Sequence, residues 1–161
     1  MKGLILFLLI APVIMIAQSP ITYDQVIRLD SISKDDLFNR GNHWLVDVFK
    51  DPSKVIQLKD KEEGQIVGKG NFPYMQTKKS WSAWVNTKGV VNFTIKLYFK
   101  EGRYRYVITD FAHDADWSFG VVTDAPDCGC KFPFANKKWK GLIWNDLKDQ
   151  IDIKVEGIVT S

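Results

Sequence analysis

A seven-residue acidic stretch holds the side chains best suited to catalysis or metal binding. It contains Asp110, His113, Asp114 and Asp116. Three carboxylates and an imidazole could bind a hard divalent cation, or supply a general acid and a general base. The spacing does not match a calcium loop, which needs regularly spaced ligands and a glycine turn, or a zinc site with paired histidines or cysteines. We therefore expect a solvated acidic turn after a strand, with a metal-dependent or hydrolytic enzyme as the alternative.

The two cysteines, Cys128 and Cys130, are separated by a single glycine. In an oxidising compartment, such a pair forms a disulfide or half of a metal site. We expect a structural disulfide, because Gly129 relaxes the backbone between the thiols. A redox pair and a copper or zinc site completed by His43 or His113 are the alternatives. The sequence has no nucleophile elbow, zinc-protease helix or Cys-x-x-Cys motif, so we predict no catalytic residue, no resident metal and no cofactor.

A predicted hairpin over residues 90–111 carries the third chemical feature, a patch of basic and tyrosine side chains. Apolar residues alternate with polar ones, and pairing Leu97 with Tyr106 places every large apolar side chain on one side. A loop of two or four residues around Glu101 and Gly102 satisfies this register. The patch is either simply solvated, or it binds an envelope protein, an anionic glycan or a lipid headgroup. Its members are Lys96, Tyr98, Lys100, Arg103 and Arg105.

Two helices and three further strands must position these groups. Ser33 is a suitable N-cap, and the apolar stripe that follows at helical spacing predicts a helix that ends before Pro52. Residues 138–158 show the same spacing and predict a second amphipathic helix. The apolar helix stripes and the apolar side of the hairpin need each other for burial, which predicts an α+β domain: a twisted, mostly antiparallel sheet with both helices on one face. Besides the hairpin, strands are predicted at residues 21–29, 55–59 and 65–72.

The first residues of the chain predict export. Lys2 precedes an uninterrupted run of apolar and small residues from Leu4 to Ala17, shorter than the ~20 residues that span a bilayer and typical of a signal peptide. We expect residues 1–17 to be cleaved, leaving residues 18–161 as one periplasmic or extracellular domain without a transmembrane span. Export excludes cytosolic nucleic acid and nucleotides as partners. The net charge, +3 for the whole chain, is too small to indicate a polyanion partner by itself.

The predicted order of strand, helix, four strands and helix resembles that of domain-of-unknown-function family 4468, exported bacterial proteins with a TBP-like fold. The motifs that carry the resemblance are SKDDLFNR at residues 33–40, Trp44, DKEEGQIVGKG at residues 60–70, EGRYRY at residues 101–106 and TDF at residues 109–111. The resemblance implies a TBP-like β-α-β-β-β-β-α fold and assigns no activity, since a shared fold does not transfer a DNA-binding role. We therefore predict a non-enzymatic exported binding or accessory protein of the cell envelope.

Overall fold

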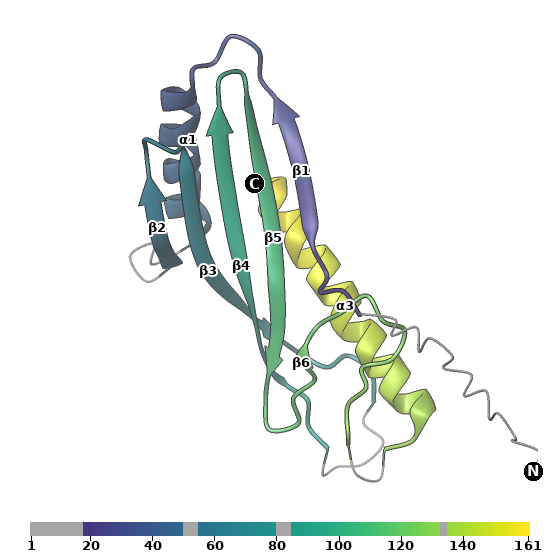
Figure 1. Cartoon of the computed structure of the whole chain (residues 1–161). Helices are drawn as coiled ribbons and strands as arrows, with labels where there is room; N and C mark the ends of the chain where they lie inside the picture. Colours follow the sequence, from purple (N-terminus) through teal and green to yellow (C-terminus); the bar gives the residue numbers. More distant parts are fainter. Residues whose placement is uncertain (1–17, 50–54, 80–84, 133–134) are drawn as a thin grey trace, which may run out of the picture.

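In its described residues the chain forms an antiparallel sheet with two helices on one of its faces (Figure 1). The structure is a computed structural model that describes residues 18–49, 55–79, 85–132 and 135–161. In space the strands run in the order β1-β5-β4-β3-β2, and the short β6 pairs with β5. The elements are β1 (Tyr23–Arg28), α1 (Lys34–Val48), β2 (Ile56–Asp60), β3 (Gln65–Tyr74), β4 (Gly89–Lys100), β5 (Arg103–Asp114), β6 (Gly120–Val121) and α3 (Lys137–Val159).

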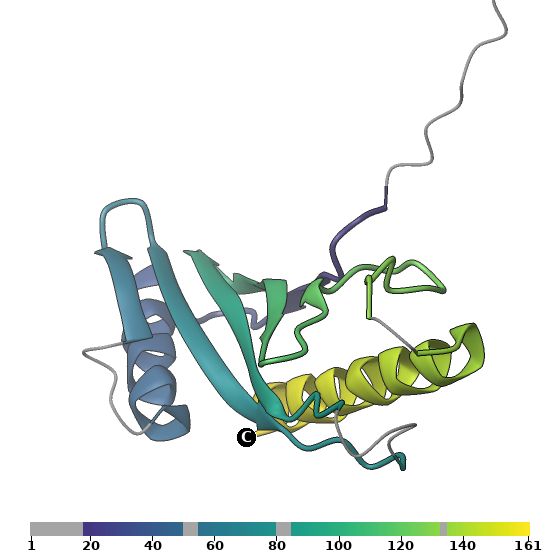
Figure 2. The same cartoon turned by 90° about the horizontal axis from the view of Figure 1, so that it is seen from below.

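The layer arrangement confirms the predicted α+β class. Seen from below, α1 and α3 lie on the same side of the sheet (Figure 2). Within the described residues, no helix covers the opposite side, which we call the open face. The predicted signal peptide, residues 1–17, lies outside the described residues. Neither α1 nor α3 is long and apolar enough to cross a membrane.

Both helices begin at a side-chain cap. The Ser33 hydroxyl accepts a hydrogen bond from the Asp36 amide at 3.1 Å, as the sequence predicts for α1. The Asn136 side chain accepts from the Trp139 amide at 2.8 Å and starts α3 one residue before the predicted Lys138. Lys137 and Lys138 place positive charge in the first turn, where the helix dipole disfavours it. The helix still starts there, because the Asn136 cap satisfies an amide that would otherwise lack a partner.

The β4–β5 hairpin has the register that the alternation of apolar residues predicts. Leu97 pairs with Tyr106, and the two-residue loop of Glu101 and Gly102 joins the strands. Gly102 has a φ of 68°, a left-handed conformation that glycine adopts without strain. Leu97 and Ile108 are buried against the helices. A slip of one residue would move this apolar set to the open face, so burial fixes the register.

A bulge in β5 changes the end of this strand and corrects the sequence prediction. Asn92 pairs with Ala112 and Thr94 pairs with Thr109, so β5 has one more residue than β4 in this interval. The strand then continues to Asp114, so Asp110 and Asp114 of the expected acidic turn belong to β5, whereas Asp116 lies in the turn that follows the strand. The physical cause lies at Asp110, whose φ of 58° resets the alternation of side chains between the two faces.

Candidate functional site

His113 is a core residue whose ring is held by neighbouring side chains and backbone groups. Its side chain is 2% exposed and packs against the rings of Tyr74 and Phe119. Nε2 lies 2.9 Å from the Thr87 carbonyl oxygen, and Nδ1 accepts a hydrogen bond from the Phe119 amide at 3.1 Å. Burial lowers the pKa of His113, which favours the neutral imidazole that these two partners require. Both ring nitrogens are therefore occupied.

The structure does not bring the predicted acidic cluster together. Asp110, Asp114 and Asp116 are exposed to solvent, whereas His113 is in the core. Within the described residues, no group of three or more histidine, cysteine or acidic side chains is placed to hold a metal ion. His43 lies on the exposed surface of α1. Both ring nitrogens of His113 already have backbone partners, so this imidazole is not placed to act as a general base beside the carboxylates.

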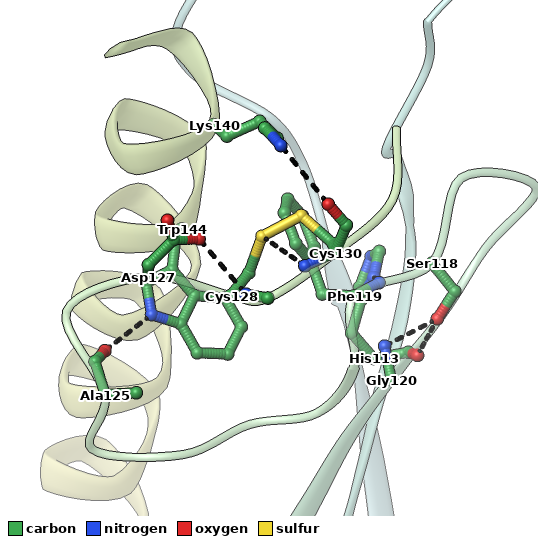
Figure 3. Close-up of a disulfide and its surroundings, with 11 residues drawn as sticks. His113, Ser118, Phe119, Gly120, Ala125, Asp127, Cys128, Cys130, Lys140 and Trp144 are labelled. Atoms are coloured by element: carbon green, nitrogen blue, oxygen red, sulfur yellow. Dashed lines mark hydrogen bonds between the residues drawn. A yellow bond between two sulfur atoms is a disulfide. The ribbon is translucent and has the colours of Figure 1, made fainter. Parts of the chain in front are cut away.

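The two cysteines form the expected disulfide, which closes a short loop against α3 (Figure 3). Gly129, between them, has a φ of 61°, and its amide donates to the Asp127 carboxylate at 3.1 Å. Lys140 on α3 donates to the Cys130 carbonyl at 3.3 Å. Because a disulfide-bonded sulfur is not a thiolate, the copper or zinc half-site that the sequence leaves open does not exist in this form of the protein.

The aromatic side chains around this loop attach it to the helix. Trp144 is fully buried on α3 and donates from its indole to the Ala125 carbonyl at 2.8 Å. The rings of Phe119 and Phe132 pack against one another, and Phe119 also contacts Trp144. The disulfide therefore lies beside an aromatic cluster that extends the core. This packing indicates that the loop has a structural role.

The open face carries the basic and tyrosine patch that the sequence predicts, but one of its cations is paired. Arg105 donates from Nε and Nη2 to the Asp24 carboxylate at 2.7 and 2.5 Å. The same guanidinium lies 6.0 Å from the centre of the Tyr98 ring. Hydrogen bonding from Arg105 lowers the pKa of Asp24. The charge of Arg105 is thus balanced by β1, a partner that the hairpin sequence does not reveal.

A row of three cations crosses the same face at the end of the sheet. Arg103 on β5 lies directly between Lys100 on β4 and Arg28 on β1. All three side chains are exposed, and no carboxylate of the described residues forms an ion pair with any of them. Like charges placed opposite each other across strands destabilise a sheet. We call these three residues the basic row.

A polar groove lies further along the open face. It crosses strands β2 to β5, and Lys96 and Tyr98 on β4 separate it from the basic row. Asn71 and Asn92 are directly paired neighbours in the sheet, and both line the groove. Hairpin spacing alone does not reveal this groove, because its residues come from four strands. Its polar side chains are Gln57, Lys69, Asn71, Asn92, Thr94 and Asp110.

Comparisons with known proteins agree with this architecture. The family model described as a domain of unknown function (DUF4468) with TBP-like fold matches residues 23–114. A solved TBP-like protein from Parabacteroides distasonis ATCC 8503 superimposes with a TM-score of 0.60 at 13% identity, covering 88% of this chain and 91% of that one. A solved DUF4468 family protein from Bacteroides ovatus ATCC 8483 gives 0.56 at 14% identity, with coverages of 88% and 87%. No curated protein matches the chain. At these identities the two structures are similar in fold alone.

Proposed function

The chain belongs to the DUF4468 family, a domain of unknown function with a TBP-like fold, and we propose that it is a non-enzymatic, exported binding or accessory protein of the bacterial cell envelope. The binding surface in this proposal is the open face, and the ligand is an anionic glycan. The observation that carries the proposal is the basic row, in which Arg28, Arg103 and Lys100 stand side by side without an acidic partner in the described residues.

Electrostatics supports an anionic ligand. The directly opposed cations of the basic row repel one another, and a bound anion would remove this repulsion and gain attraction to all three. The contrast with Arg105 is informative, since Asp24 already pairs with that cation. The charges of the basic row therefore remain available to a partner, as does that of Lys96, which forms no ion pair in the described residues either.

The polar groove supports a glycan in particular. Amide side chains such as Asn71 and Asn92 offer both donors and acceptors, which match the hydroxyl groups of a sugar. Tyr98 lies between the groove and the basic row and is half-buried, so part of its ring is available for apolar contact with a ligand. An acidic sugar chain lying along β4 would reach the groove with its hydroxyls and the basic row with its carboxylates.

Binding to polygalacturonate, an acidic glycan, tests the proposal. The double variant Arg28→Gln/Arg103→Gln should lose about tenfold in affinity, because two charge-assisted contacts are removed. The control double variant Lys138→Gln/Lys154→Gln removes the same charge from exposed positions of α3 and should bind like the unmodified protein. Raising the salt concentration should weaken binding by the unmodified protein and the control alike.

Two outcomes would contradict the proposal. An equal loss in both double variants would mean that polygalacturonate responds only to total charge. Binding to phosphatidylglycerol vesicles or to polyglutamate, together with no binding to polygalacturonate, would replace the glycan by a lipid headgroup or an acidic protein segment.

A further inference from the structure

An apolar pocket lies on the helix side of the sheet, away from the open face. It has a volume of about 190 Å³ and is located between α1 and the C-terminal end of α3. In Figure 1 this end of α3, marked C, lies behind β5. The floor is the buried inner surface of these two strands, with Ile95, Leu97 and Ile108 no more than 3% exposed.

The placement of the two helices leaves a hollow over this strip of sheet. Gly41 allows α1 to approach β4 so closely that a Cβ atom there would lie 2.3 Å from Cζ of Phe99. α3 is held elsewhere, by hydrogen bonds from Tyr23 to Asp152 and from Tyr74 to Asp146. Between these two attachments, the inner face of β5 is only partly covered.

The walls of the pocket are aromatic and apolar, and several remain accessible from outside. Trp44 of α1 and the β5 residues Tyr104 and Tyr106 line it and are half-buried. At its rim, Leu29 is 36% exposed and Val159 is 39% exposed. Partly exposed aromatic and aliphatic groups around a preformed hollow are the usual composition of a small-molecule site.

Arg40 is the one charged residue among the described residues that line the pocket. It lies exposed on α1 and forms no ion pair within the described residues. The Tyr106 hydroxyl donates to Gln25 at 2.6 Å, whereas the Tyr104 hydroxyl has no hydrogen-bond partner in the described part of the chain. Arg40 and Tyr104 are therefore lining residues whose polar groups have no partner in the described part of the chain, beside otherwise mainly apolar walls.

We propose that this pocket binds a small amphipathic carboxylate, with its apolar body over Ile95 and Leu97 and its carboxylate at Arg40. The planar guanidinium of arginine matches a carboxylate with two parallel hydrogen bonds. The volume corresponds to about six groups of the size of a water or methylene, at roughly 30 Å³ each. A carboxylate of medium chain length, such as octanoate, fits if the charged end stays at the mouth. The site is separate from the open face and does not depend on the function proposed for that face.

Titration of the mature chain with octanoate tests this inference, with 1-octanol as the uncharged match. NMR follows binding at the indole of Trp44, and calorimetry gives the affinity. We expect Arg40→Gln to weaken octanoate binding about tenfold and to leave 1-octanol binding unchanged, because only the charge-assisted contact is lost. Val159→Trp, which fills the pocket from its rim, should weaken binding of both ligands about tenfold. Arg103→Gln on the open face is the control and should change neither.

Several results would overturn the inference. These are no change at Trp44 on addition of octanoate, unchanged octanoate affinity in Arg40→Gln, and an equal loss of affinity in Arg103→Gln. A dimer in sedimentation experiments that Val159→Trp dissociates would identify a second copy of the chain as the occupant, which also contradicts the proposal. If Val159→Trp does not fold, Leu29→Trp is the second variant that fills the pocket from an exposed lining residue.

Discussion

Asp146 on α3 connects this helix to the end of β3, and its replacement by alanine should destabilise the protein strongly. The side chain is 5% exposed and accepts a hydrogen bond from the Tyr74 hydroxyl at 2.9 Å. It also accepts from the Thr77 amide at 3.1 Å and from the Thr77 hydroxyl. Gln150, one turn along α3, donates to the same carboxylate at 3.3 Å.

The expected loss follows from these contacts. Asp146→Ala leaves the fully buried Tyr74 hydroxyl without this acceptor, which costs about 1–3 kcal/mol, and each hydrogen bond lost from Thr77 costs about 1 kcal/mol. The sum is about 4 kcal/mol in the free energy of unfolding. For a domain of this size, that corresponds to a fall in Tm of about 12 °C, at roughly 3 °C per kcal/mol.

A double-mutant cycle in urea denaturation checks the reasoning. Tyr74→Phe removes the hydroxyl that Asp146 accepts from, so the double variant should be less destabilised than the sum of the single variants, by about 1–2 kcal/mol. Asp149→Ala changes an exposed acidic residue of the same helix and should stay within ~0.5 kcal/mol of the unmodified protein. A loss below about 1 kcal/mol in Asp146→Ala, or an additive cycle, would refute the structural role of this carboxylate.

Two further predictions concern packing and pH. Gly41→Ala should lower the free energy of unfolding by about 1–2 kcal/mol in urea denaturation, because the new methyl group overlaps Phe99 and overpacking outweighs the better helix propensity of alanine. The control Gly157→Ala on α3, where a methyl group meets open space, should instead stabilise the protein by up to ~1 kcal/mol. Equal effects of the two substitutions would contradict the close approach of α1 to the sheet. The free energy of unfolding should fall as the pH drops below about 6.5. Burial lowers the pKa of His113, so below this pH the unfolded chain binds a proton that the folded chain does not. An NMR titration that gives His113 an ordinary or raised pKa would contradict this pH dependence.

Local patterns predicted the hairpin and the start of α1 correctly. The alternation over β4 and β5 leaves one register that buries Leu97 against the helices, so burial alone specifies the pairing. The start of α1 was predictable because its cap is local, with the Ser33 hydroxyl and the Asp36 amide three residues apart. The disulfide follows from proximity in sequence, since only Gly129 separates its two cysteines.

The remaining features depend on contacts between distant parts of the chain. Arg105 is paired with Asp24, 81 residues earlier, and the basic row includes Arg28 because β1 lies beside β5. The sequence does not indicate which strand lies beside the hairpin, so the pairing of Arg105 with Asp24 and of Arg103 with Arg28 could not be predicted. The bulge at Asp110 is local, but its effect is to extend β5 where alternation alone indicates that the strand ends.

The choice between an open-face ligand and a merely solvated surface is tested most directly by NMR mapping of polygalacturonate binding on the chain without its predicted signal peptide. The proposal predicts that shift changes concentrate at the basic row, Arg28, Arg103 and Lys100, and extend along β4 to Asn92 in the polar groove. Amides of α1 and α3 should remain unchanged, because both helices lie on the other side of the sheet. Shift changes spread evenly over both sides of the sheet, or none with polygalacturonate in excess at low salt, would contradict the assignment of the open face as the binding surface.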